Sequence, residues 1–181
     1  MKFRTGARAL FPIVWAWPDK IDAQTASLSR AVSHSFHIGT EANEHLAVEV
    51  LAREHPDQSD YWDGNWLTAQ VDVASGPWHG NYRAALRAEE FVHFRDQLHL
   101  LTEDREAPPA EFESMEPWLR FTVHRSDRHG HVRINGRAQT EPFFDSHNVF
   151  YFVLELDQNL LAATLDELAN LIEEFPVVGS R

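Results

Sequence analysis

The 181-residue sequence contains no cysteine. This absence excludes a disulfide framework, thiol catalysis and zinc sites built from cysteine, and it agrees with a reducing cytoplasm. No apolar run approaches the roughly 18 residues that a membrane-spanning helix needs. The run 9–17 follows three basic residues, but Pro12 interrupts it and no cleavage site of small residues follows. We therefore expect a cytoplasmic protein without a signal peptide.

The common sequence motifs of enzyme active sites are also missing. There is no Gly-rich phosphate loop, no Gly-x-Ser-x-Gly turn and no His-Glu-x-x-His pair. Asp60, Asp63 and His79 could act as acid and base, but aspartates at turns commonly accept hydrogen bonds from the local backbone. The histidine groups lack a carboxylate at metal-ligand spacing. We therefore predict no catalytic residue, no cofactor and no metal site.

Basic residues are few, and they are unevenly placed. Sixteen Lys and Arg stand against 28 Asp and Glu, which gives a formal net charge of −12. The segment between Ala138 and Ser180 has eight acids and no Lys or Arg. Such a charge would repel phosphates, so we do not expect direct binding to nucleic acid. It would suit a basic protein partner, although an ordinary acidic surface is the simpler interpretation.

Apolar residues make up 43% of the sequence, and their spacing predicts an α+β fold. Alternation of apolar and polar residues predicts strands, and apolar stripes at spacings of three and four predict two amphipathic helices. Short connections favour an antiparallel sheet of about six to eight strands with both helices packed on it. The strand at 149–156 is apolar on both faces, which favours a central position in the sheet. The predicted strands are 46–51, 67–73, 78–86, 119–123, 131–135 and 149–156, and the predicted helices are 88–101 and 161–175.

The length suits a single domain, but the patterns are not equally clear along the chain. Residues 1–40 show weak periodicity and contain Pro12 and Pro18, so we interpret them as an N-terminal extension. Residues 41–181 contain the clear strand and helix patterns. We therefore predict one α+β domain over residues 41–181.

A tryptophan-rich motif over residues 61–67 precedes one of the predicted strands. The step Asp63-Gly64 is a strong turn signal, and Trp62 and Trp66 lie on either side of it. We interpret the motif, which also includes Tyr61, as structural, with both indoles in the core. The alternative is that the two tryptophans form a platform for a ligand or a partner.

The sequence resembles the WapI family of immunity proteins over roughly residues 45–178. The family normally has a Thr where this sequence has Asn159. The matching features are the motif 61–67, Gly76 and Gly80, Glu90-Phe91, Gly130-His131-Val132, Leu156-Asp157-Gln158 with Leu160-Leu161, and Phe175-Pro176-Val177.

The resemblance implies a small cytoplasmic protein that binds and neutralises the C-terminal toxic domain of a bacterial polymorphic toxin. That domain is a tRNA-cleaving nuclease in the founding pair, and the family offers no catalytic residues to carry over. A nuclease is basic where it holds phosphates, so an acidic surface could occupy that site. We expect the contacts at acids of the C-terminal helix, and second at the segment Glu103–Glu116. The candidate residues are Asp166, Glu167, Glu173, Glu174, Glu103 and Asp104. The alternatives are a binding or scaffold module unrelated to toxins, and a small-molecule binder using Trp62 and Trp66.

Overall fold

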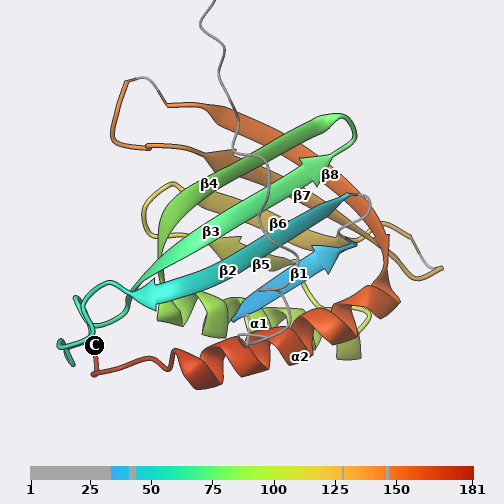
Figure 1. Ribbon diagram of the computed structural model, residues 1–181. Helices are drawn as coiled ribbons and strands as arrows, with labels where there is room; N and C mark the ends of the chain where they lie inside the picture. The colour runs from blue at the N-terminus through green and yellow to red at the C-terminus, as the bar shows by residue number, and fades with distance from the viewer. Residues whose placement is uncertain (1–33, 41–43, 128, 146) are drawn as a thin grey trace, which may run out of the picture. The chain divides into compact units, whose positions relative to one another are not determined.

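The computed structural model describes residues 34–40, 44–127, 129–145 and 147–181. Within them, a group of four strands followed by a helix occurs twice (Figure 1). The elements are β1 (Ser35–Gly39), β2 (His45–Arg53), β3 (Trp66–Ser75), β4 (Trp78–Arg87), α1 (Ala88–Glu103), β5 (Ala110–Glu113), β6 (Leu119–Arg125), β7 (His131–Gln139), β8 (Val149–Asp157), the short 3-10 helix η1 (Gln158–Leu160) and α2 (Leu161–Glu174). The predicted α+β class, with antiparallel strands and two helices, is confirmed.

The strands form two antiparallel sheets, with the orders β1-β2-β3-β4 and β5-β6-β7-β8. Because side chains alternate between the faces of a strand, the apolar positions of each sheet gather on one face. In the first sheet, for example, Val48 lies opposite Val71, and both are fully buried. In the second, Val123 lies opposite Ile134. The predicted hairpins joining β3 to β4 and β6 to β7 are present.

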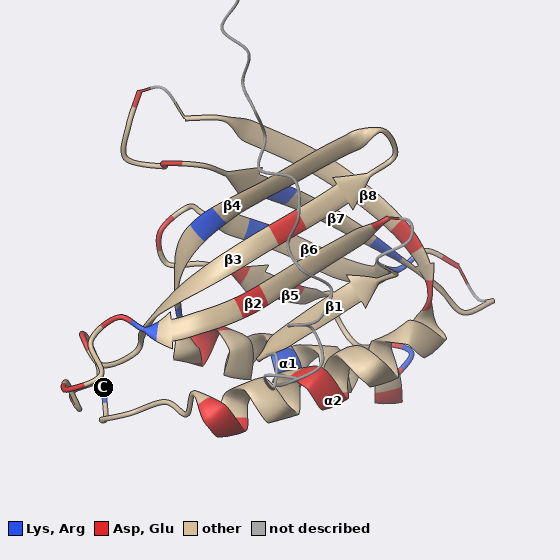
Figure 2. Cartoon of the chain, viewed as in Figure 1, with Lys and Arg blue, Asp and Glu red and all other residues tan. Residues whose placement is uncertain are grey.

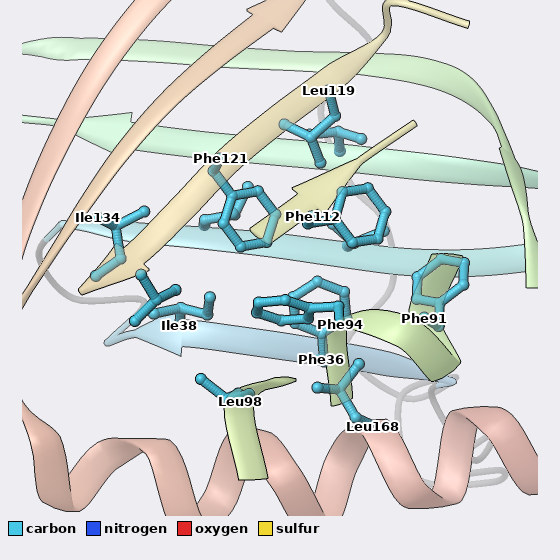
Figure 3. Packing of buried hydrophobic residues seen from close by; sticks show 14 of the residues in the cluster. Phe36, Ile38, Phe91, Phe94, Leu98, Phe112, Leu119, Phe121, Ile134 and Leu168 are labelled. Atoms are coloured by element: carbon cyan, nitrogen blue, oxygen red, sulfur yellow. The ribbon is translucent and has the colours of Figure 1, made fainter. Parts of the chain in front are cut away.

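The two sheets share one hydrophobic core, which is rich in phenylalanine (Figure 3). Phe36 comes from the first sheet, Phe112 and Phe121 from the second, and Phe91 and Phe94 from α1. Their ring centroids lie 5.0 to 6.5 Å apart, mostly edge to face. This is the spacing at which aromatic pairs attract one another beyond simple area burial. Helix α1 therefore joins the two sheets.

Helix α2 packs beside β1 and covers the free edge of that strand (Figure 1). The predicted apolar stripe is present, with Leu161 and Leu168 buried. Two polar side chains of α2 also bind the backbone of β1: Glu167 accepts a hydrogen bond from the His37 N–H at 2.7 Å, and Thr164 donates one to the His37 carbonyl at 2.5 Å. The unpaired edge of a strand can form hydrogen bonds with another chain, and α2 covers this edge of β1.

Three expectations from the sequence need correction. Residues 35–39, placed in the N-terminal extension, form β1 and pair with β2, and the extension before residue 34 lies outside the described residues. The strand at 149–156 corresponds to β8, which pairs with β7 alone and lies at the edge of its sheet. The motif tryptophans are not both core, because Trp62 is 54% exposed and Trp66 is half-buried.

Candidate partner-binding surfaces

The tryptophan motif is organised around Arg87, a residue that the sequence did not single out. Arg87 is 1% exposed, and its guanidinium donates hydrogen bonds to the carbonyls of Tyr61 and Trp62 at 2.8 and 2.9 Å. It also forms an ion pair with Glu89 at 2.5 Å. The rings of Tyr61, Trp62 and Trp66 lie 5.1 to 5.8 Å from the guanidinium carbon, within the range of cation–π attraction. The motif therefore encloses a buried cation, and Glu89 balances its charge.

The turn before β3 holds the segment that follows α2. Asp60 accepts hydrogen bonds from the backbone N–H groups of Trp62 and Asp63, as expected for an aspartate at a turn. The buried Asn65 binds both the N–H and the carbonyl of Val178, each at 2.9 Å. At Gly64 a Cβ atom would lie 2.7 Å from the Asp60 carbonyl oxygen, so no larger residue fits. Asp60, Gly64 and Asn65 thus stabilise this turn and its contact with the segment after α2.

A shallow depression of about 370 Å³ lies beside the exposed indole of Trp62. Met115, which is 57% exposed, and Glu113 contribute to its lining. Glu90 also lines it and accepts hydrogen bonds from the backbone N–H groups of Arg87 and Met115. Burial raises the pKa of Glu90 to about 7, although these two hydrogen bonds oppose the shift. One side of the Trp62 indole is thus exposed and available to a partner, while its ring and carbonyl contact Arg87.

The candidate acids of α2 fall into two groups. Glu167 binds β1, and Glu174 lies 4.0 Å from the His34 ring, so both have contacts within the fold. Asp166 and Glu173 lie on the same helix and off its buried stripe. Figure 2 shows acidic and no basic segments along α2. Helix α2 therefore carries negative charge, and it contains no lysine or arginine that would offset this charge.

Glu103 and Asp104 lie at the end of α1. The exposed Glu103 carboxylate is 3.5 Å from the ring of His99, one helical turn earlier. Asp104 accepts a hydrogen bond from the backbone N–H of Glu106 and so stabilises the turn after the helix. Both residues are exposed.

A polar cluster occupies the outer face of the first sheet. Asp72 contacts the rings of His45 and His79 at 2.7 and 3.1 Å and accepts a hydrogen bond from Asn81. Burial alone would raise the pKa of Asp72, but the hydrogen bonds from Asn81, His45 and His79 hold it below its usual value. Within the described ranges, no group of three or more His, Asp or Glu has an arrangement that could hold a metal ion. His79 therefore lies in this cluster and is not part of the tryptophan motif.

The sequence analysis missed an exposed apolar surface where β4 and β8 lie. We call it the aromatic rim and define it as Trp78, Phe143, Phe144, Val149 and Tyr151. Trp78 and Val149 line a groove of about 460 Å³ between the two strands, and Tyr151 follows Val149 on the same face of β8. Alternation in β8 indicated two apolar faces, but the pattern could not show that none of the described residues covers one of those faces.

Comparison with known families identifies the class of this protein. The model of the Immunity protein WapI-like family matches residues 37–176. The chain belongs to this family. The resemblance based on the motif 61–67 is therefore confirmed. The match begins within β1 and ends just after α2, so it includes the tryptophan motif, the α2 acids and the aromatic rim of this WapI-like protein.

Two further comparisons were made for the WapI-like chain. Among solved structures, it matches a chain from the crystal structures of Trypanosoma bruciei MRP1/MRP2, with a TM-score of 0.45 and 11% sequence identity. That match covers 88% of this chain and 96% of the other. No curated protein matches the WapI-like chain at a significant level. No helix within the described ranges is long and apolar enough to cross a membrane.

Proposed function

We propose that this WapI-like immunity protein binds the C-terminal toxic domain of a cognate bacterial polymorphic toxin in the cytoplasm and blocks it. We further propose that this domain is a basic nuclease and that the immunity protein acts by binding, without catalysis. The family match over residues 37–176 is the observation that carries the proposal. The net charge of −12 supports a basic partner, because complementary charge accelerates encounter and favours the correct partner.

The acids of α2 and of the α1 end are proposed to attract the toxin domain. Asp166 and Glu173 are the strongest candidates, because Glu167 contacts β1 and Glu174 contacts His34 within the fold. Glu103 and Asp104 add negative charge at the end of the neighbouring helix α1. Exposed charges of this kind change the association rate more than the lifetime of a complex.

Coexpression with the toxin's C-terminal domain tests the proposed function. Cells that produce the toxic domain alone should die, and cells that also produce the immunity protein should grow, because a stable complex blocks the toxic surface. Growth after induction is the measurement, with the toxic domain of an unrelated toxin as the control. Continued killing while the immunity protein accumulates in folded form would contradict the proposal.

Charge reversal on α2 tests the proposed role of its acids. The double variant Asp166→Lys, Glu173→Lys should slow association with the toxin domain several-fold and weaken its salt dependence, with little change in the dissociation rate. Stopped-flow kinetics at several salt concentrations measure both effects. The double variant Glu49→Lys, Asp57→Lys makes the same change in net charge at exposed acids outside α2. Equal slowing by both double variants would show a general charge effect and no specific role for α2.

A further inference from the structure

We propose that the aromatic rim is the contact that holds the toxin domain, and that it receives an apolar projection from that domain's basic surface. This inference rests on the proposed function and extends it by naming the contact surface. It assigns affinity to the side of the fold where β4 and β8 lie, while the acids of α2 contribute attraction at a distance.

The exposure of the rim is unusual for side chains of this size. Trp78 and Tyr151 are 70% and 72% exposed, and Phe143 and Phe144 are 65% and 64% exposed. Single exposed apolar residues are ordinary, but a group of them marks an interaction surface. Tryptophan and tyrosine are also the residues that most often carry binding energy at protein interfaces. The rim therefore has the composition of an interface centre.

In the loop between β7 and β8, contacts of the described residues 140–145 and 147–148 hold two of the rim side chains. Thr140 and Asn148 close its base, with the Thr140 N–H bonded to the Asn148 carbonyl and the Asn148 N–H bonded to the Thr140 hydroxyl. The Phe144 N–H donates to the Glu141 carbonyl at 3.0 Å. Phe143 packs edge to face on Trp118, at 6.4 Å between centroids. A loop ordered before binding loses less entropy when the partner arrives.

Glu141 in this loop adopts a backbone conformation that is unfavourable for its residue type. Its φ angle is +44°, and it is the non-glycine residue with positive φ among those that the structure describes. Strained residues persist where the surrounding structure enforces them, and they gather at functional sites. Here the strained residue comes shortly before Phe143 and Phe144, which are both exposed to solvent. The strain therefore lies in the segment that carries the two exposed rings.

The groove beside the loop offers a preformed apolar floor. Val73, Tyr82, Ala138 and Phe150 line it below Trp78. The Tyr82 hydroxyl donates a hydrogen bond to the Trp118 carbonyl at 2.8 Å, so the polar end of this ring is satisfied and its position is set. The groove volume of about 460 Å³ lies within the range of sites that enclose apolar groups. An apolar side chain from a partner can thus be buried here without breaking internal contacts.

Charge at the rim matches a basic partner. Glu141 and Asp145 flank Phe143 and Phe144 and are exposed, and the segment from Ala138 to Ser180 has no lysine or arginine. Arg137 lies opposite Tyr151 in the sheet and keeps its positive charge, because the Gln139 side chain that accepts its hydrogen bond is neutral. A basic surface with an apolar projection would therefore meet two aromatic rings bordered by two carboxylates. This combination gives both affinity and correct orientation.

Alanine substitutions in the rim test this inference. In calorimetry with the full chain and the purified toxin domain, Phe144→Ala and Trp78→Ala should each weaken binding about 10- to 100-fold. Leu100→Ala and Met115→Ala, which remove side chains of similar exposure outside the rim, should change affinity less than about threefold. Unchanged melting temperatures should show that all four variants fold.

Hydrogen exchange of the wild-type complex gives a second measurement that needs no substitution. Amides of residues 140–151 should gain protection when the toxin domain binds. Tight binding by wild-type protein, with neither protection of this segment nor loss of affinity in the rim variants, would overturn the inference and leave the proposed function intact. Absence of any binding would overturn the proposed function itself. If Phe144→Ala instead breaks a dimer of this chain while its toxin affinity is unchanged, the rim joins two copies and the inference is wrong.

Discussion

Replacing Arg87 with methionine should destabilise the fold by about 3–5 kcal/mol, the usual cost of removing one member of a buried ion pair. The Glu89 carboxylate, whose side chain is 12% exposed, would lose its ion-pair partner. The Trp62 carbonyl would lose its Arg87 donor, and the Tyr61 carbonyl would keep only the hydrogen bond from the Asn65 side chain. Methionine fills part of the space but offers no hydrogen bond, so the polar groups around it would be left unsatisfied.

Urea denaturation of the wild type and of Arg87→Met measures this effect. The matched control is Arg83→Met, which removes an exposed arginine from the same strand and should cost well under 1 kcal/mol. Adding Glu89→Gln to Arg87→Met should recover part of the loss, because the double variant no longer buries an unpaired charge. Equal midpoints for Arg87→Met and Arg83→Met would show that the buried arginine does not stabilise the motif.

Replacing Gly136 with alanine should destabilise the protein by at least about 1–3 kcal/mol, the usual cost of overpacking a core. Gly136 lies opposite Phe152 in neighbouring strands, and the aromatic ring covers it. An added Cβ atom would lie 2.0 Å from the Phe152 Cζ atom and 2.5 Å from the two Cε atoms. Either the ring or the backbone of β7 must therefore move, and the ring is packed in the common core.

Gly80→Ala is the matched control, because Gly80 also lies in a strand but its added Cβ would meet no atom closer than 3.8 Å. Thermal unfolding of both variants gives the comparison. The double variant Gly136→Ala, Phe152→Leu should lose less stability than the sum of its single substitutions, because leucine lacks the ring atoms that the added Cβ would meet. A Gly136→Ala protein as stable as Gly80→Ala would contradict the packing argument.

The sequence predicted the regular parts of the fold well because periodicity reports local burial. The alternation 67–73 gave β3, and the stripe from Leu161 to Phe175 gave α2. Strand β1 was missed because it has only five residues, and so short a strand shows too little alternation to be recognised in a weakly periodic segment. Its position depends on pairing with β2, which is a contact between segments and not a local property.

The functional surfaces were harder to predict, for the same reason. Arg87 follows an alternating strand and looks like an exposed cation, yet the loop 61–66 folds over it and buries it. Glu167 lies off the apolar stripe of α2, as a solvent-facing acid would, but the neighbour on that side is the edge of β1. Residue type and spacing indicated the secondary structure, whereas the role of each charge depended on which distant segment lies beside it.

The bonds between His37 and the side chains of Thr164 and Glu167 have a consequence for synthesis of the protein. They join residues 127 and 130 positions apart, so the first described strand acquires its outer neighbour only after nearly the whole chain has left the ribosome. A ribosome-bound chain lacking α2 would expose the side of β1 to other nascent chains. The outer edge of β1 is therefore covered only after α2 has been synthesised.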